Sequence, residues 1–147
     1  MENELENYIL EHISEEDEVL KELARETYVK VFHPRQLSGH LQGKILEMIS
    51  KMINPKHILE LGTFTGYSAI CLAKGLQDDG KLITIEVNDE IETIFKKYLE
   101  KSGLPDKIIQ KIGDAIDIIP EIDMNFDLVF IDANKKSYID YYNLVFD

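Results

Sequence analysis

The fold of this chain is decided by Ile58-Leu-Glu-Leu-Gly-Thr-Phe-Thr-Gly-Tyr-Ser68, which joins a strand, a glycine turn and a helix start. Its apolar beginning is typical of a central parallel strand, and Gly62 and Gly66 allow a sharp turn that lets a ligand approach the backbone closely. The residues that follow, Tyr67–Ala73, predict a helix whose first amides could face an anionic or polar group. Together these features indicate a nucleotide-cofactor site.

Short apolar strands alternate with helices on the C-terminal side of Asn54-Pro55. This alternation predicts right-handed βαβ units and therefore an α/β, Rossmann-like fold with a parallel sheet flanked by helices. We expect strands at His57–Leu61, 82–86, Ile108–Ile112 and Leu128–Ile131, and helices at 67–76, 89–102, 115–119 and from about Ser137.

The residues before Asn54 repeat their apolar positions at helical spacing, with a break at Pro34. We therefore expect an N-terminal helical segment at 1–54 and a cofactor-binding Rossmann-like domain at 55–147. Ser14 with Asp17 three residues later predicts a loose capping box at the start of one of these helices.

Composition excludes several classes of protein. With 147 residues, 44% hydrophobic and 30% charged, the chain has the make-up of a soluble globular domain. The N-terminus lacks the features of a signal peptide and no apolar run could span a bilayer, so we expect a cytoplasmic protein without a membrane partner. The net charge of −12 disfavours nonspecific nucleic-acid binding, and the single cysteine, Cys71, is expected to be a buried structural thiol.

The turn carries acids in informative positions. Glu60 stands two residues before Gly62, and Thr63 and Phe64 follow it, so the dinucleotide fingerprint G-x-G-x-x-G is absent. An NAD-dependent oxidoreductase, which would share the fold, is therefore the weaker alternative. Glu86 ends a predicted strand 24 residues after Gly62, near the interval of roughly 20 residues typical of ribose-binding acids. The form E-x-G-x-x-x-G resembles the first motif of class I methyltransferases that use S-adenosylmethionine.

A wider resemblance, to the cation-dependent O-methyltransferases of the caffeoyl-CoA and catechol type, runs from about Arg35 onward. Four blocks carry it in the right order. They are Arg35-Gln-Leu-Ser-Gly-His-Leu-Gln-Gly43, Glu60-Leu-Gly-Thr-Phe-Thr-Gly-Tyr-Ser68, Ile83-Thr-Ile-Glu86 and Phe126-Asp-Leu-Val-Phe-Ile-Asp-Ala-Asn-Lys-Lys-Ser-Tyr138.

The resemblance implies S-adenosylmethionine as the cofactor. Glu60 would accept from its ammonium group, directly or through water, Ser68 would bond its carboxylate, and Glu86 would accept from the ribose hydroxyls. Asp114, within Gly113-Asp-Ala115, would accept from the adenine amino group. The implied cofactor residues are Glu60, Gly62, Thr63, Gly66, Ser68, Glu86, Asp114, Ala115 and Asp132.

Simpler interpretations stay open for several of these residues. Gly62 and Gly66 are also what an ordinary tight turn requires, and Glu86 could be a surface acid at a strand end. Asp114 before a helix is also a common N-cap.

The segment after the last strand is where the resemblance places the chemistry. It implies that Asp132 is a ligand of Mg²⁺ or another divalent cation and that Lys135 is the general base that removes a hydroxyl proton. The alternative for Lys135 is a solvated lysine beside Lys136. The two other metal ligands of the family follow a fifth strand and have no counterpart here. We therefore expect a C-terminally truncated form that binds metal weakly and is catalytically poor.

The methyl acceptor is not legible in the sequence. The resemblance implies a small catechol-like hydroxylated molecule or a hydroxylated uridine of transfer RNA, and the acidic charge favours the small molecule. A noncatalytic cofactor-binding module is the third possibility. Members of the family are commonly dimers, so a homodimer is expected.

Overall fold

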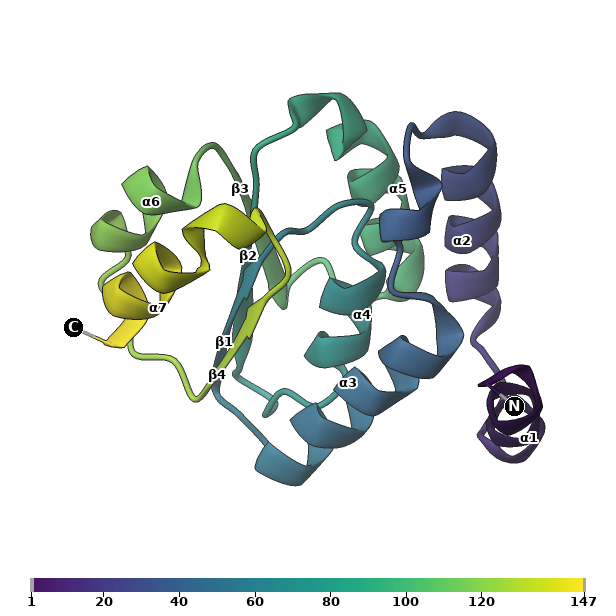
Figure 1. The fold of residues 1–147 in the computed structure, drawn as a ribbon. Coiled ribbons are helices and arrows are strands. Elements are labelled where there is room, and N and C mark those ends of the chain that lie inside the picture. The colour runs from purple at the N-terminus through teal and green to yellow at the C-terminus, as the bar shows by residue number, and fades with distance from the viewer. Residues whose placement is uncertain (1, 147) are drawn as a thin grey trace.

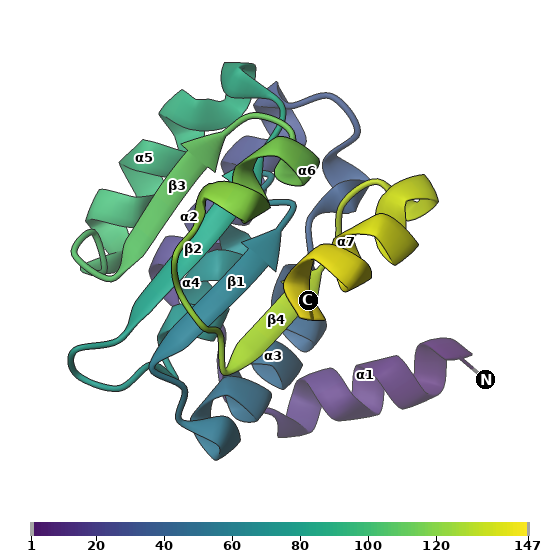
Figure 2. The same cartoon turned by 90° about the vertical axis from the view of Figure 1, so that its left-hand side faces the viewer.

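The computed structural model describes residues 2–146 and contains a four-stranded sheet in the order β3-β2-β1-β4. All neighbouring strands are parallel, as predicted from the alternation of strands and helices (Figure 2). β1 lies between β2 and β4, so the chain reverses its direction of travel across the sheet after β3. In such sheets ligands bind beyond the carboxyl ends of the strands on either side of this switch point. The strands are β1 (His57–Leu61), β2 (Lys81–Glu86), β3 (Ile108–Ile112) and β4 (Leu128–Ile131).

Helices cover both faces of the sheet, which Figure 1 shows nearly edge-on. One face carries α4 (Tyr67–Ala73) and α5 (Glu92–Ser102), with α2 and α3 of the N-terminal part packed beyond them. The other face carries α6 (Ala115–Ile118) and α7 (Tyr138–Phe146). Two apolar clusters, one on each face, form the core, and the layered arrangement is that of an α/β protein.

The strand predictions are confirmed, with β2 beginning one residue before the expected 82. Helix α4 instead ends at Ala73, three residues before the expected end at 76. Just beyond this end, at Gly75, an added Cβ would lie 2.3 Å from the backbone carbon of Ser50, so α3 passes very close to the chain here. Short 3-10 turns flank α5, α6 and α7, and they are η2 (Asp89–Ile91), η3 (Ile119–Glu121) and η4 (Lys135–Ser137).

The N-terminal part is helical, as expected from its periodicity. It consists of α1 (Glu2–His12), α2 (Glu18–Lys30), η1 (Pro34–Gln36) and α3 (Gly39–Ile53). Leu20, Leu23 and Leu46 lie buried in the core cluster that also contains α4, so these helices complete the core on this face of the sheet. None of the described helices is long and apolar enough to cross a membrane.

The capping box predicted at Ser14 is wrong. The N-cap of α2 is Asp17, whose side chain accepts no hydrogen bond from the first turn and pairs instead with Lys74 of the α4 end. The Ser14 carbonyl oxygen accepts a hydrogen bond from His40 Nε2 at 3.0 Å. Long-range pairing has therefore displaced the local capping interaction.

Cys71 is buried, as predicted, and is 1% exposed. Burial in the apolar cluster raises the pKa of its thiol to about 12, which makes it unreactive at neutral pH.

Candidate functional site

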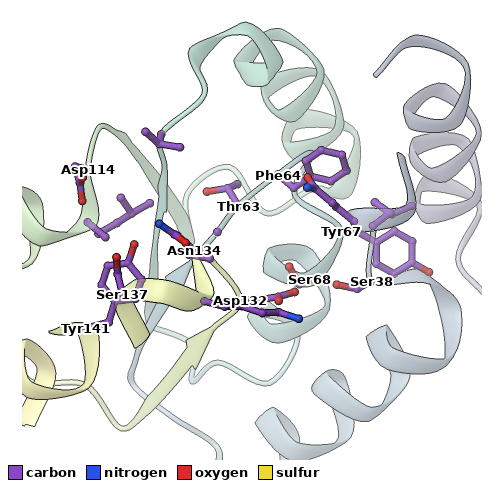
Figure 3. A pocket seen from close by; sticks show the side chains of 18 of the residues that line it. Ser38, Thr63, Phe64, Tyr67, Ser68, Asp114, Asp132, Asn134, Ser137 and Tyr141 are labelled. Carbon is purple, nitrogen blue, oxygen red and sulfur yellow. The ribbon is translucent and has the colours of Figure 1, made fainter. Parts of the chain in front are cut away.

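A cavity of about 710 Å³ lies at the carboxyl edge of the sheet, where the switch point between β1 and β4 places it. Residues that follow each of the four strands line it: Gly62 after β1, Val87 after β2, Gly113 after β3 and Asp132 after β4. The rest of the wall comes from the segment that contains η1 and from α4, η4 and α7. Figure 3 shows Ser38, Ser68 and Tyr67 toward one end of the view and Asp114, Ser137 and Tyr141 toward the other. This volume is within the range typical of pockets for cofactors and small ligands.

The glycine turn after β1 fits closely against the end of β4. Gly62 has φ +100°, and an added Cβ would stand 2.3 Å from the carbonyl oxygen of Asp132. Gly66, at φ +95°, is similarly close to the ring of Phe95 on α5. The absence of side chains at both glycines thus lets the turn pack against protein atoms, and Gly66 is not part of the cavity wall.

The amides of the turn already have partners within the protein. The N–H groups of Gly62 and Thr63 donate to the Ile85 carbonyl oxygen at 2.9 and 3.3 Å, and that of Gly66 donates to the Thr63 carbonyl at 2.9 Å. These amides fix the turn and are not free to receive an anionic ligand. Gly62 and Thr63 therefore shape the cavity wall and do not supply free backbone donors to it.

Glu86 at the end of β2 is held by two backbone amides. Its Oε2 accepts from the Phe64 N–H at 2.7 Å and its Oε1 accepts from the Asn88 N–H at 3.0 Å. Phe64 itself has φ +48°, a conformation that aromatic residues rarely adopt, and its side chain lines the cavity. The carboxylate thus stabilises a strained residue of the turn after β1.

Glu60 is fully buried beneath the cavity and does not line it. Its Oε2 accepts from Thr84 Oγ1 at 2.6 Å, and Thr84 Oγ1 lies 2.6 Å from Thr63 Oγ1. Because the Thr84 proton points to Glu60, Thr63 donates to Thr84. Among the described residues the second oxygen of Glu60, Oε1, has no hydrogen-bond partner.

The protonation of Glu60 follows from this environment. Burial raises the pKa of its carboxyl to about 7, the hydroxyls of Ser68 and Thr84 oppose the rise, and the acids Asp132 and Glu86 reinforce it. A carboxylate in such a place is costly unless a positive group is brought near it.

The turn after β3 supplies another wall through Gly113, Asp114 and Ala115. Asp114 Oδ1 accepts from the Ile116 N–H at 2.9 Å and so caps α6. The capping interpretation left open from the sequence is therefore correct, and the same side chain also lines the cavity. Asp114 can cap α6 through Oδ1 and still present its second oxygen, Oδ2, to the cavity.

The end of β4 brings Asp132, Asn134 and Lys135 to the cavity wall. All three are exposed, and Asn134 Oδ1 accepts from the Lys136 N–H at 3.2 Å, which caps η4. In the described part of the chain, no three His, Cys, Asp or Glu side chains come together in a group that could hold a metal ion. One carboxylate and one engaged amide oxygen fall short of the oxygen ligands that Mg²⁺ needs, so these residues do not fit a divalent cation by themselves.

The structure thus separates the predicted site residues into two groups. The first lines the cavity and consists of Gly62, Thr63, Ser68, Asp114, Ala115, Asp132 and Lys135. The second, Glu60, Gly66 and Glu86, supports that wall from behind.

Other lining residues, Ser38, Phe64, Tyr141 and Asn134 among them, were not assigned from the sequence. The sequence position of Asn134 could have predicted its place in the cavity, since it follows Asp132 just beyond the carboxyl end of a strand. Tyr141 had none, because its place depends on how α7 folds back.

Comparison with known proteins assigns this arrangement to a family. The family profile described as O-methyltransferase matches residues 10–147 of the chain. The catechol O-methyltransferase of Niastella koreensis is 33% identical over 142 residues, which cover 94% of this chain and 64% of that protein. Caffeoyl-CoA O-methyltransferase 1 of Nicotiana tabacum is 37% identical over 150 residues, which cover 95% of this chain and 62% of that protein. The chain thus spans less than two thirds of the length of these relatives.

A solved structure has the same fold. The crystal structure of the O-methyltransferase TomG from Streptomyces achromogenes, in complex with SAM, superposes with a TM-score of 0.90 at 33% identity. The match covers 97% of this chain and 65% of that one. The expectation of a Rossmann-like class I methyltransferase fold is confirmed.

Proposed function

Because the chain belongs to the O-methyltransferase family, we propose that it binds S-adenosylmethionine and moves its methyl group to a hydroxyl of a small catechol-like acceptor. The observation that carries the proposal is the single cavity wall that joins the turn after β1 to Asp132 and Lys135 after β4. A cofactor against the turn and an acceptor beside Lys135 would then be neighbours.

The residues of the first three strand ends fit this cofactor. Ser68, buried in the first turn of α4, offers a hydroxyl to its methionine end. Asp114 has one oxygen free of the cap for the adenine amino group. Glu86 is the acid proposed for the ribose hydroxyls, and its two backbone hydrogen bonds keep the carboxylate in one orientation. It is not part of the cavity wall, so this contact requires the ribose to reach the strand end beneath Phe64.

The cofactor supplies a methyl group on a positively charged sulfur. The chain must make the acceptor oxygen nucleophilic, and Lys135 is the group proposed to do so. Its ammonium form cannot accept a proton, so the neutral amine is the active form of this base. Phe64 and Tyr141 contribute apolar surface that excludes water around the transfer.

Metal assistance does not enter this mechanism. Asp132 is the one described carboxylate at the end of β4 that faces the cavity, and we expect it to bind Mg²⁺ weakly when no further ligands are supplied. Poor turnover of this chain by itself is therefore part of the proposal.

The test is methyl transfer from S-adenosylmethionine to 3,4-dihydroxybenzoate, measured with and without Mg²⁺ on the unaltered chain and on two variants. Lys135→Ala should lower the rate at least about 100-fold, since a general base contributes on that scale. Lys136→Ala is the matched control because its side chain does not line the cavity, and it should keep the rate.

Cofactor binding is measured by calorimetry on the same three proteins and should be equal in all of them. Equal loss of rate in the two lysine variants would contradict the role of Lys135. A failure of the unaltered chain to bind S-adenosylmethionine would contradict the proposed function as a whole.

A further inference from the structure

We propose that Arg35 selects an acceptor that carries a carboxylate in addition to its hydroxyls. This inference rests on the proposed function and specifies the substrate class of the same cavity. The cations of the cavity wall differ from the lysines of the helices in whether they form ion pairs. The lysines of the helices have acidic partners, as in the pairs of Lys74 with Asp17 and Lys97 with Glu26.

Two cations of the cavity wall lack such partners. Arg35 and Lys135 line the cavity from the N-terminal segment and from the end of β4, and neither forms an ion pair with any described acid. Five further cations form no ion pair with a described acid, but none of them lines the cavity: Arg25, Lys81, Lys107, Lys111 and Lys136. A guanidinium left unpaired at a cavity mouth in so acidic a protein is available to an anionic ligand.

The backbone under Arg35 is well fixed. The Gln36 and Leu37 N–H groups donate to the carbonyl oxygens of His33 and Pro34, both at 3.1 Å, and form the 3-10 turn η1. Leu37 packs against the buried core cluster. The backbone that carries Arg35 is thus already ordered, so binding a ligand needs to order only the side chain.

A carboxylate is the anion that this side chain recognises best. Guanidinium is planar and can donate two parallel hydrogen bonds to the two oxygens of one carboxylate. A polyanion is a poorer match, because the net charge of −12 repels an extended phosphate backbone. The structure therefore favours a small dihydroxylated aromatic acid over a nucleic acid.

The carboxylate of the cofactor is the other possible anion. Ser68 is buried in the cavity wall beside the cofactor turn, whereas Arg35 is exposed at the mouth. Figure 3 shows the hydroxyls of Ser38 and Ser68 at the same end of the cavity, so the methionine end has neutral donors of its own. The cofactor's carboxylate therefore does not need Arg35, and the guanidinium can bind the carboxylate of the acceptor.

The experiment compares 3,4-dihydroxybenzoate with 3,4-dihydroxybenzamide, which share the ring and both hydroxyls and differ by one negative charge. Each is titrated calorimetrically into the chain saturated with S-adenosylhomocysteine, so that no turnover occurs. The unaltered chain should bind the benzoate roughly tenfold more tightly, as expected for a charge-assisted pair. Arg35→Gln should bring the two affinities together and leave the affinity for S-adenosylhomocysteine unchanged.

Arg25→Gln is the matched control, because Arg25 is the only other arginine and lies on α2 beside Tyr98, away from this cavity. It should keep the preference for the benzoate. The proposal is overturned if the unaltered chain binds both compounds equally or neither, or if Arg35→Gln keeps the preference. It is also overturned if Arg35→Gln weakens S-adenosylhomocysteine instead, since Arg35 would then serve the cofactor.

Binding of S-adenosylhomocysteine is established first in each protein. Its absence in the unaltered chain would overturn the proposed function and with it this inference. Its presence, together with no preference for the benzoate, would overturn the inference alone.

Discussion

The carboxyl ends of β1 and β4 meet at the same cavity and are built in opposite ways. The last four residues of β1 are buried, and the turn that follows has its amides bonded to the Ile85 carbonyl oxygen and to Glu86. β4 is an edge strand whose four residues are half-buried, and Asp132, Asn134 and Lys135 after it are exposed. The first end is held by the interior, and the second presents its side chains to solvent.

Because of this difference, the two parts of the proposed reaction, cofactor binding and acceptor activation, have different structural requirements. The cofactor half depends on a pre-formed surface, whose disturbance should change stability and binding together. The acceptor half depends on exposed chemical groups, whose removal should change reactivity alone. Substitutions at the two ends can test this separation.

The largest effect is expected from Gly62→Ala, which would break the contact between the two ends. The new Cβ would overlap the Asp132 carbonyl at a residue with φ +100°. Strain and overpacking together should lower the free energy of unfolding by about 4 kcal/mol, measured by urea denaturation. Gly103→Ala is the control, because Gly103 has φ +72° and nothing within 4 Å of an added Cβ. It should cost only about 1 kcal/mol, and equal losses would show that the contact is unimportant.

Glu60→Gln tests whether the buried acid near the end of β1 has a raised pKa. The pKa of Glu60 is raised from 4.5 to about 7, so its contribution to stability is present below about pH 4.5 and is lost as pH rises through about 7. Between pH 5 and pH 8 the unaltered chain should therefore lose about 2 kcal/mol more than Glu60→Gln. Urea denaturation at several pH values measures the difference.

Glu26 offers a contrast of opposite sign to Glu60. Hydrogen bonds from Lys30, Lys97 and Tyr98 lower its pKa to about 2, so its stabilising contribution is present above pH 4.5 and lost as pH falls through about 2. Glu26→Gln should therefore destabilise most at neutral pH. If both variants followed the same pH trend, the raised pKa of Glu60 would be wrong.

Glu86→Ala removes the acceptor of the Phe64 amide and so loosens the cofactor loop. The affinity for S-adenosylhomocysteine should fall roughly tenfold or more, in line with the loss of a hydrogen bond to a charged group. Calorimetry measures it, with the exposed neighbour Glu90→Ala as control. An unchanged affinity would mean that Glu86 neither supports the loop nor contacts the cofactor.

Asp132→Asn should have the smallest effect on the folded protein. The side chain is exposed, so the free energy of unfolding should change by no more than about 0.5 kcal/mol. Binding of S-adenosylhomocysteine should persist, and any stimulation of methyl transfer by added Mg²⁺ should be lost, because Asp132 is the carboxylate expected to bind the cation weakly. A large loss of stability would show that the β4 end, like the β1 end, is part of the rigid frame.

Much of the fold could be predicted because its signals are local. Apolar runs bounded by glycine, proline and polar residues gave the four strands almost to the residue. The early end of α4 was not predicted, and neither was the close approach of Ser50 to Gly75 just beyond it, which no local pattern signals. The capping box at Ser14 failed for the same reason, because Asp17 pairs with the distant Lys74.

The candidate site divides in a similar way. The resemblance implied that Gly62, Thr63, Asp114 and Asp132 belong to one site. The structure brings them to one cavity, because strands of a parallel sheet have their carboxyl ends at the same edge. The sequence could not reveal that the Gly62 and Thr63 amides are already bonded to Ile85, or that Phe64 adopts a positive φ.

The sequence by itself determined the order of the strands and helices along the chain, the position of the glycine turn after β1 and the acids at the strand ends. These properties follow from apolar periodicity and from the sterics of neighbouring residues. Only the tertiary structure decided that Glu60 is buried with a raised pKa, that Glu86 fixes Phe64 and that Arg35 is left unpaired at the cavity. Solvation and charge pairing depend on which distant elements come to cover a side chain, and that is settled only when the chain has folded.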